Sequence, residues 1–161
     1  MASEAQPGGA FTLSWIGLRP QRHGPINPVT RAELDATRGL LGDHAAGKRN
    51  PLRQVTLITT VDLDHINQQL GRIVHPAILR RNLVLSGDGE RPQKGDWWNI
   101  GDVILEITAP CAPCKRMGWI LGPGGYNAMR GHGGHTARII RGGLIETGMS
   151  SQPAQSGLFG D

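Results

Sequence analysis

Turn residues limit the length of every regular element in this chain. Glycine (24) and proline (11) together make up about a fifth of the 161 residues, and no Gly-X-Y period is present. Both residues favour turns and weaken the interior of a helix or strand. This usage predicts short strands joined by frequent turns rather than a helical bundle. The chain is also long enough to form one domain with a hydrophobic core.

Between the turns lie short apolar and β-branched runs, a composition typical of strands. The predicted strands are residues 11–18, 53–60, 82–86, 96–100, 103–109, 136–141 and 143–147, the last two as a hairpin around Gly142-Gly143. Residues 61–70 have the apolar spacing of a helix, with Thr60 as its cap and Gly71 at its end. Shorter helices are predicted near Pro76 and within residues 111–121.

These elements predict a mainly β fold, in which a mostly antiparallel sheet curls into a β-barrel with a few short helices. No internal repeat and no long linker divides the chain, so one domain is expected over residues 11–148. Residues 1–10 are predicted to be a flexible N-terminus, and residues 149–161 a flexible C-terminal tail.

Arginine dominates the charge of the chain, supplying 14 of its 17 basic residues, against 13 acidic ones. Because these residues are spread along the sequence and aromatics make up only 4%, the balance favours one compact anionic ligand over a nucleic acid. The sequence has no apolar run of about 18 residues, so it predicts no membrane span, and no secretory signal is evident. With two cysteines rather than a disulfide framework, we expect a cytoplasmic protein without a membrane partner.

The segment Cys111-Ala112-Pro113-Cys114 is the sharpest local feature, because it joins a predicted strand to a predicted helix. A thiol at a helix N-terminus has a lowered pKa, and Lys115 and Arg116 would lower it further. The pair fits two ordinary core residues. It also resembles a redox dithiol, although such motifs occur in a β-α-β unit and this chain is poor in helices. It also fits a structural zinc site with His132 and His135, although seventeen residues separate the two pairs. A fourth reading is one cysteine as the soft ligand of a transition metal held by an organic cofactor.

Two further clusters are candidates for binding an anion. In Arg80-Arg81-Asn82, two adjacent guanidinium groups entering a strand would point to opposite faces, and the Asn82 amide adds a donor. Residues 42–47, which include His44, form a glycine-flanked loop followed by basic residues that include Arg53. This loop lacks the Ser or Thr of a Walker A motif. Each cluster also fits a solvated basic surface turn.

Taken in order, these segments resemble the MOSC domain. This is the C-terminal domain of eukaryotic molybdenum-cofactor sulfurases, which also occurs alone in bacteria and in amidoxime-reducing enzymes. The matching segments are GLLGDHAAG (39–47), RQVTLI (53–58), RRNL (80–83), IGD (100–102), VILEIT (103–108), APC (112–114) and the stretch from Ala137-Arg138 to Gly142-Gly143.

The resemblance implies a barrel-like β fold that handles molybdenum cofactor, a pterin with a dithiolene and a phosphate. The family's characteristic cysteine matches Cys114, which ligates molybdenum in amidoxime-reducing relatives and has been thought to handle sulfur in the sulfurases. The match also places Arg80, Arg81 and Asn82 near the cofactor, together with His44 and Arg53. Cys111 lies outside the match.

The resemblance leads us to expect a stand-alone MOSC protein that reduces a small-molecule substrate, an N-hydroxylated base or an amidoxime, with Cys114 as the catalytic residue and metal ligand. No pyridoxal phosphate is expected in this chain. The chain has no ferredoxin cluster motif, so a partner protein would supply electrons. The alternatives are a carrier that takes sulfur from a donor protein as a persulfide on Cys114, and a non-catalytic binding module with structural zinc.

Overall fold

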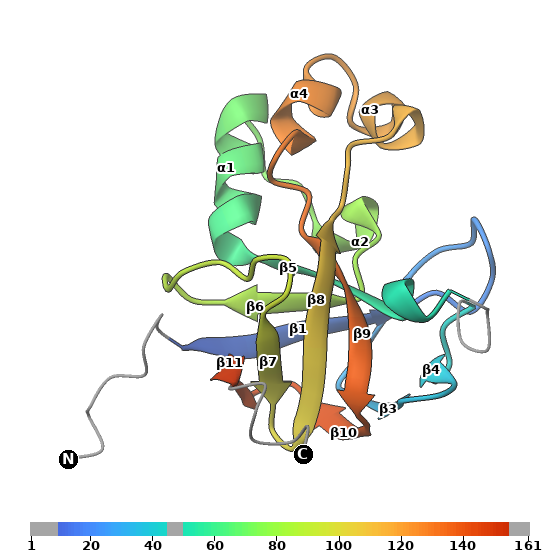
Figure 1. Cartoon of the computed structure of the whole chain (residues 1–161). Helices are drawn as coiled ribbons and strands as arrows, with labels where there is room; N and C mark the ends of the chain where they lie inside the picture. Colours follow the sequence, from blue (N-terminus) through green and yellow to red (C-terminus); the bar gives the residue numbers. More distant parts are fainter. Residues whose placement is uncertain (1–9, 45–49, 155–161) are drawn as a thin grey trace.

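A closed β-barrel forms the centre of the computed structural model, which describes residues 10–44 and 50–154 (Figure 1). The described strands follow one another around the barrel in the order β11-β7-β8-β9-β5-β6-β1, and β1 pairs with β11 to close it. Their bounds are β1 Phe11–Leu18, β5 Val55–Thr59, β6 Leu83–Ser86, β7 Trp97–Ile100, β8 Val103–Pro110, β9 His135–Arg141 and β11 Ser150–Ala154. The predicted mainly β, barrel-like fold is therefore confirmed.

Smaller elements flank the barrel at both ends. Strand β2 (Asn27–Val29) extends the sheet beside β1, and β3 (Arg31–Asp35), β4 (Gly39–Leu40) and β10 (Gly143–Glu146) form a separate three-stranded sheet. The helices are α1 (Thr60–Leu70), α2 (Pro76–Leu79), α3 (Lys115–Leu121) and α4 (Gly125–Met129), with a 3-10 turn at Pro51–Arg53. Figure 1 shows α1, α3 and α4 together above the barrel; we call α1 to α4 the helical cap.

Strands β5 and β6 run parallel and are buried on both faces. Leu57 of β5 packs into the barrel core with Leu83 and Leu85 of β6. The intervening side chains, Ile58 and Val84, pack into a second core beneath the helical cap. This explains why both strands read as nearly continuous apolar runs, since parallel strands covered on both sides lack polar alternation.

Helix α1 follows β5 directly and, with α2, connects it to β6; the structure confirms the helix predicted over residues 61–70. Its cap is Thr59 rather than the predicted Thr60, because the Thr59 Oγ1 accepts a hydrogen bond from the Asp62 N at 3.3 Å. Gly71 ends the helix with φ 69°, a left-handed conformation that favours glycine. In the described residues no helix is both long and apolar enough to cross a membrane.

The predicted hairpin around Gly142-Gly143 is wrong, although both strands exist. Strand β9 pairs with β8 and β5, whereas β10 leaves the barrel and pairs with β3. The chain crosses from one sheet to the other at Gly142, where an added Cβ would lie 2.3 Å from the Leu34 carbonyl oxygen. Glycine is needed here for the close passage of two backbones, not for a hairpin turn.

The predicted tail also differs from the structure, because Ser150–Ala154 form strand β11 in the barrel. Its polar sequence gives little sign of a strand, but Ser151 is fully buried and lies opposite both Phe11 and Ile100. Pairing with two neighbours stabilises this strand despite its composition. Residues 1–9 and 155–161, the rest of the predicted flexible ends, lie outside the described residues.

Gly134, immediately before β9, generates a stability prediction. It has φ 86°, and an added Cβ would lie 2.2 Å from the Leu57 carbonyl oxygen. We expect Gly134→Ala to lower the free energy of unfolding by about 2–4 kcal/mol, because backbone strain adds to steric overlap. Gly148 is the control, since it has φ 100° and nothing within 4 Å. Gly148→Ala should cost only about 1–2 kcal/mol in urea unfolding; equal losses would contradict the overlap.

Candidate functional site

The candidate site lies where three segments leave the barrel on the side of the helical cap. Strand β8 ends at Pro110 and continues through the cysteine motif into α3 (Figure 1). Strand β1 ends at Leu18 and is followed by Arg19, and α2 leads through Arg80 and Arg81 into β6. The site is thus built from loop residues at the ends of rigid elements.

Cys114 is exposed and is the N-cap residue of α3. Its Sγ accepts a hydrogen bond from the Met117 N at 3.4 Å, which fixes the thiol at the start of the helix. Pro113 prevents the helix from starting earlier, because the residue before a proline disfavours the helical conformation. The short helix predicted within residues 111–121 is confirmed, and it begins immediately after Cys114.

Cys111 differs from Cys114 in its surroundings. It is half-buried, and burial raises the pKa of its thiol, opposed by the charges of Arg81 and Arg53. Its backbone N donates to the Gly134 carbonyl at 2.8 Å, which attaches the motif to the start of β9. The two thiols are therefore not equivalent: Cys111 keeps its proton at neutral pH, and Cys114 faces solvent.

Two adjoining hollows connect Cys114 to the other predicted residues. The first, of about 500 Å³, is lined by both cysteines, Arg53, Thr108 and Thr136, among others. The second, of about 800 Å³, is lined by Arg53, His44, Arg22 and Pro20. Arg53 thus borders both hollows, and the structure brings Cys114, Arg53 and His44 along one surface. Residues 45–49 of the predicted loop lie outside the described residues.

Arginine side chains from three segments act on one another electrostatically; we call Arg19, Arg80, Arg81 and Arg116 the arginine cluster. Burial lowers the pKa of Arg19; Asp43 opposes this, and the charges of Arg81 and Arg116 add to it. Burial likewise lowers the pKa of Arg80, with further lowering by Arg19 and Arg116. Like charges held this close repel one another, so an anion among them is favoured.

Arg19 gives this cluster its most direct indication of a missing partner. The Nε of Arg19 is buried and has no hydrogen-bond partner among the described residues. A buried donor without a partner costs about 1–3 kcal/mol. Its backbone, by contrast, is well held, because its N donates to Asp43 Oδ1 at 2.8 Å and its carbonyl accepts from the His44 N at 2.7 Å.

The structure places Arg80 and Arg81 differently from the strand-based expectation. Strand β6 begins only at Leu83, and Arg80 is the left-handed cap of α2 with φ 62°. Its Nη1 donates to the Gly24 carbonyl at 3.0 Å. The Arg81 guanidinium donates to the carbonyls of Gly133 at 2.7 Å and Leu79 at 3.0 Å. Neither residue lies in a strand, so the predicted strand alternation is wrong as the reason for their directions, although the two guanidinium groups do bind different segments.

Asn82 is buried, and its amide binds the barrel. Its Nδ2 donates to the Gly17 carbonyl at 3.1 Å and to Asp43 Oδ1 at 3.2 Å. Its Oδ1 accepts from the Thr56 N at 3.0 Å and the Thr56 Oγ1 at 3.1 Å. In this arrangement Asn82 acts on the site by holding Asp43, which in turn holds Arg19.

Sequence reasoning missed Arg19 as a site residue and considered Arg116 only for its effect on the thiol. Arg19 carries no local motif; it simply follows a strand and precedes a proline-rich turn. His23, in that same turn, was also missed; its pKa is lowered first by Arg116, then by burial and by Arg22, Arg80 and Arg19. These residues become neighbours only through the folding of the barrel.

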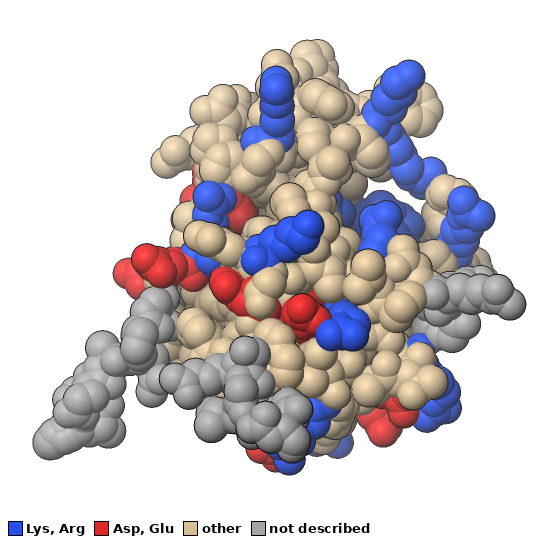
Figure 2. All heavy atoms as spheres, in the orientation of Figure 1, with Lys and Arg blue, Asp and Glu red and all other residues tan. Residues whose placement is uncertain are grey.

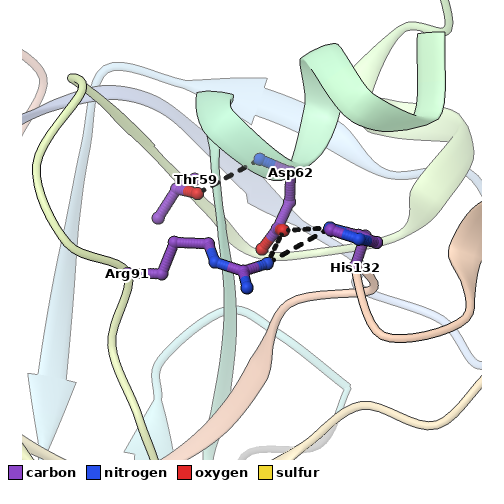
Figure 3. Close-up of polar contacts among 4 residues, drawn as sticks. All are labelled: Thr59, Asp62, Arg91 and His132. Carbon is purple, nitrogen blue, oxygen red and sulfur yellow. Dashed lines mark hydrogen bonds and ion pairs between the residues drawn. The ribbon is translucent and has the colours of Figure 1, made fainter. Parts of the chain in front are cut away.

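His132 and His135 do not form a zinc site with the cysteines. His132 Nδ1 contacts Asp62 Oδ1 at 2.8 Å, and Arg91 contacts the same carboxylate (Figure 3). The His132 ring also stacks on the His65 ring, with centroids 3.6 Å apart. Over residues 10–44 and 50–154, no group of three or more His, Cys, Asp or Glu side chains is placed to hold a metal ion. The hypothesis of structural zinc therefore has no support in this arrangement.

Comparison with known proteins places these features in a family. The MOSC domain model matches residues 30–150. The crystal structure of the YUAD protein from Bacillus subtilis superposes with a TM-score of 0.78 at 17% identity, over 91% of this chain and 97% of that one. The crystal structure of YiiM from Geobacillus stearothermophilus superposes with a TM-score of 0.71 at 17% identity, over 92% of this chain and 77% of that one. For the crystal structure of YiiM from Escherichia coli the TM-score is 0.65 at 18% identity, over 89% of this chain and 70% of that one. No curated protein sequence matches the chain significantly.

His23 provides a test of the arginine cluster. Its pKa lies below the ordinary value, chiefly because of Arg116. We expect Arg116→Gln to raise this pKa in an NMR titration, and inorganic phosphate to raise it in the unmodified protein, because each reduces the positive charge around the imidazole. By linkage, phosphate should then bind more tightly as the pH falls through the His23 pKa.

The control is Arg31→Gln, because Arg31 lies in β3 and pairs with Glu146 of the second sheet at 3.6 Å. It should leave the His23 pKa unchanged. A His23 pKa that moves equally in both variants, or in neither, would mean that Arg116 does not lie in this cluster.

Proposed function

The chain belongs to the MOSC domain family, and on that premise we propose that it binds molybdenum cofactor through Cys114 and reduces N-hydroxylated bases or amidoximes. The single observation that supports this most is that the exposed Cys114 thiol lines the same hollow as Arg53, while the charges of Arg81 and Arg53 both act on Cys111 of the same motif. A soft metal ligand and an anion-binding group are the two recognition elements that a metal dithiolene with a phosphate needs.

The residues fit this cofactor on chemical grounds. Thiolate is a soft ligand that suits a transition metal, and Cys114 presents its sulfur to solvent at the fixed start of α3. The buried Arg19 Nε, without a partner among the described residues, is a donor that a phosphate oxygen would satisfy. When bound, molybdenum cofactor supplies the two-electron redox chemistry that side chains do not provide.

The chain's own residues prepare the site for this cofactor. Burial raises the pKa of the Cys111 thiol, whereas Cys114 is the exposed cysteine and is the one that we assign as the metal ligand. Arg80 and Arg81 are held by backbone carbonyls of Gly24 and Gly133, so their positive charge is positioned before any ligand arrives. Such preorganisation reduces the entropy lost on binding. Two free thiols also suit the reducing cytoplasm, where we place the protein.

Replacement of each cysteine in turn tests the proposal. Protein purified from a host that makes molybdenum cofactor should contain about one molybdenum per chain, because Cys114 would bind a single metal. Cys114→Ser should lose most of this metal, whereas Cys111→Ser should retain it, because Cys114 is the exposed thiol and Cys111 is half-buried. Elemental analysis after gel filtration measures both.

Three results would contradict this assignment. Equal loss from the two serine variants would indicate a site that needs both thiols. Zinc alone would favour a binding module. Absence of both metals, with labile sulfane sulfur that Cys114→Ser removes, would favour the alternative of a sulfur carrier.

The arginine cluster gives a second test. We expect Arg116→Gln to weaken the affinity for isolated molybdenum cofactor by about one to two powers of ten, since a charge-assisted hydrogen bond contributes about 1.5–3 kcal/mol. Arg116→Lys should recover only part of this, because an ammonium lacks the planar fork of a guanidinium. Pterin fluorescence, measured anaerobically at fixed salt, reports the affinity. Arg31→Gln is again the control, and a loss as large there would indicate a non-specific charge effect.

A further inference from the structure

Arg53 joins the hollow that contains Cys114 to a second, larger hollow. We call the first, of about 500 Å³, the Cys114 hollow, and the second, of about 800 Å³, which is lined by Pro20, Arg22, His44 and Arg53, the Arg22 hollow. Figure 1 shows the loop after β1 and the 3-10 turn before β5 on the same side of the barrel. Small-molecule sites occupy about 300–1,000 Å³, so the Cys114 hollow alone has room for a free base. The Arg22 hollow provides room for a further part of a ligand.

The Cys114 hollow offers a ligand few hydrogen-bond donors. Much of its lining is apolar, from Leu52, Ala109, Pro110, Ala112 and Pro113. Its two hydroxyl groups bind the protein itself: Thr108 Oγ1 donates to the Leu52 carbonyl at 2.5 Å, and Thr136 Oγ1 donates to the Ala109 carbonyl at 3.3 Å. Because a hydroxyl has only one proton to donate, neither threonine has a donor left for a ligand. A planar base fits such walls, but polar recognition has to come from Arg53 and the Arg22 hollow.

The Arg22 hollow is positively charged and open to solvent. Arg22 and Arg53 are both exposed, and none of the described residues that line either hollow is an aspartate or a glutamate. Figure 2 shows Lys and Arg side chains around a hollow at the right of the molecule, whereas the acidic atoms of this face lie lower or to the left. A surface of this kind favours an anionic group on the ligand.

Backbone hydrogen bonds fix the two exposed arginines before any ligand binds. The turn that carries Arg22 is closed by a hydrogen bond from the Gly24 N to the Gln21 carbonyl at 2.9 Å. The 3-10 turn that ends at Arg53 is closed by a hydrogen bond from the Arg53 N to the Asn50 carbonyl at 3.2 Å. Because the chain is already ordered at both positions, less entropy is lost when an anion binds.

The Arg22 hollow differs from the place assigned to the phosphate of the cofactor. That phosphate is assigned to Arg19, whose Nε is buried and has no hydrogen-bond partner among the described residues. Arg22 and Arg53 are exposed instead, and they line a hollow that Arg19 does not line. Molybdenum cofactor has a single phosphate, so an anion in the Arg22 hollow has to belong to another molecule.

We propose that the substrate is an N-hydroxylated nucleoside monophosphate, with its base in the Cys114 hollow and its phosphate in the Arg22 hollow. This assignment rests on the proposed function and narrows its substrate from free bases to nucleotides. The N–O bond of the substrate breaks, and two electrons and two protons convert the hydroxylamino group into an amino group and water. The protons come from solvent, and the electrons come from an external one-electron donor, which is oxidised twice. Arg22 binds the phosphate and takes no part in breaking the bond, so it determines specificity.

The first test compares N-hydroxycytidine monophosphate with N-hydroxycytidine as substrates of the molybdenum-loaded protein, with reduced methyl viologen as the electron donor. The kcat/KM for the monophosphate should be higher by about tenfold to a hundredfold, the effect of a charge-assisted hydrogen bond. Arg22→Gln should lower this ratio by about tenfold or more. Rates are normalised to the molybdenum content of each variant, so a loss of cofactor does not affect the ratio.

Arg31→Gln is the matched control for Arg22→Gln. Arg31 is also an exposed arginine, but it lies in β3 and pairs with Glu146 at 3.6 Å, outside the lining of both hollows. It should keep the preference for the monophosphate. An equal fall of the ratio in both variants would indicate a general effect of surface charge and would overturn the role of Arg22.

The second test measures binding without turnover. Cytidine monophosphate, the product of the proposed reduction, and cytidine are titrated by calorimetry into the protein as purified and after loading with molybdenum cofactor. The monophosphate should bind about tenfold or more tightly than cytidine, and its binding should weaken as salt rises. Arg22→Gln should remove most of this difference, and Arg31→Gln should retain it.

The two tests distinguish failure of this assignment from failure of the proposed function. Cytidine monophosphate that binds through Arg22 to a protein that reduces neither substrate would support the nucleotide site and contradict the reduction. Equal kcat/KM values for the two substrates, unchanged in Arg22→Gln, would support the reduction and overturn the nucleotide site.

Other sources of phosphate give different results. Inorganic phosphate that displaces cytidine monophosphate from the loaded protein at equal concentration would mean that the Arg22 hollow takes a free ion. Cytidine monophosphate that binds only before loading would mean that the hollow holds the phosphate of the cofactor. Either result would overturn the assignment to a nucleotide substrate.

Discussion

The hydrogen bonds of the buried Asn82 amide hold the candidate site to the barrel. One side chain connects β1 through Gly17, β5 through Thr56, and the loop that carries Asp43. Asp43 in turn fixes the backbone of Arg19. Because a buried amide that loses a partner is costly, this network has one stable arrangement. The position of the arginine cluster relative to Cys114 follows from it, and so does the proposed anion site.

The cluster itself has an electrostatic cost that the fold must support. Arg19 and Arg80 are partly buried with lowered pKa values, and each is lowered further by Arg116. The charges are tolerated because Arg80 and Arg81 donate to backbone carbonyls and because Asp43 lies beside Arg19. An anion bound among these arginines would reduce their mutual repulsion, and this gain contributes to affinity in phosphate sites.

Local patterns in the sequence predicted most of the fold but only part of the site. The barrel, α1 and the helix after Cys114 follow from turn spacing, helical periodicity and an N-cap, all of which act within a few residues. Strand β11 was missed because its polar residues are stabilised by pairing with β1 and β7, far away in sequence. Arg19 was missed for the same reason: it meets Arg81 and Arg116 only after the barrel closes. Arg80 was misplaced because its left-handed cap breaks the strand pattern.

The burial of β5 and β6 on both faces has a consequence for cooperativity. Leu57 and Ile58 are neighbours in sequence, yet one belongs to the barrel core and the other to the core beneath the cap. The helical cap therefore cannot detach without exposing one face of two central strands. Cap and barrel should behave as a single foldon, with the amides of β5 exchanging only through global unfolding. Loosening of the site is then inseparable from loss of the whole domain.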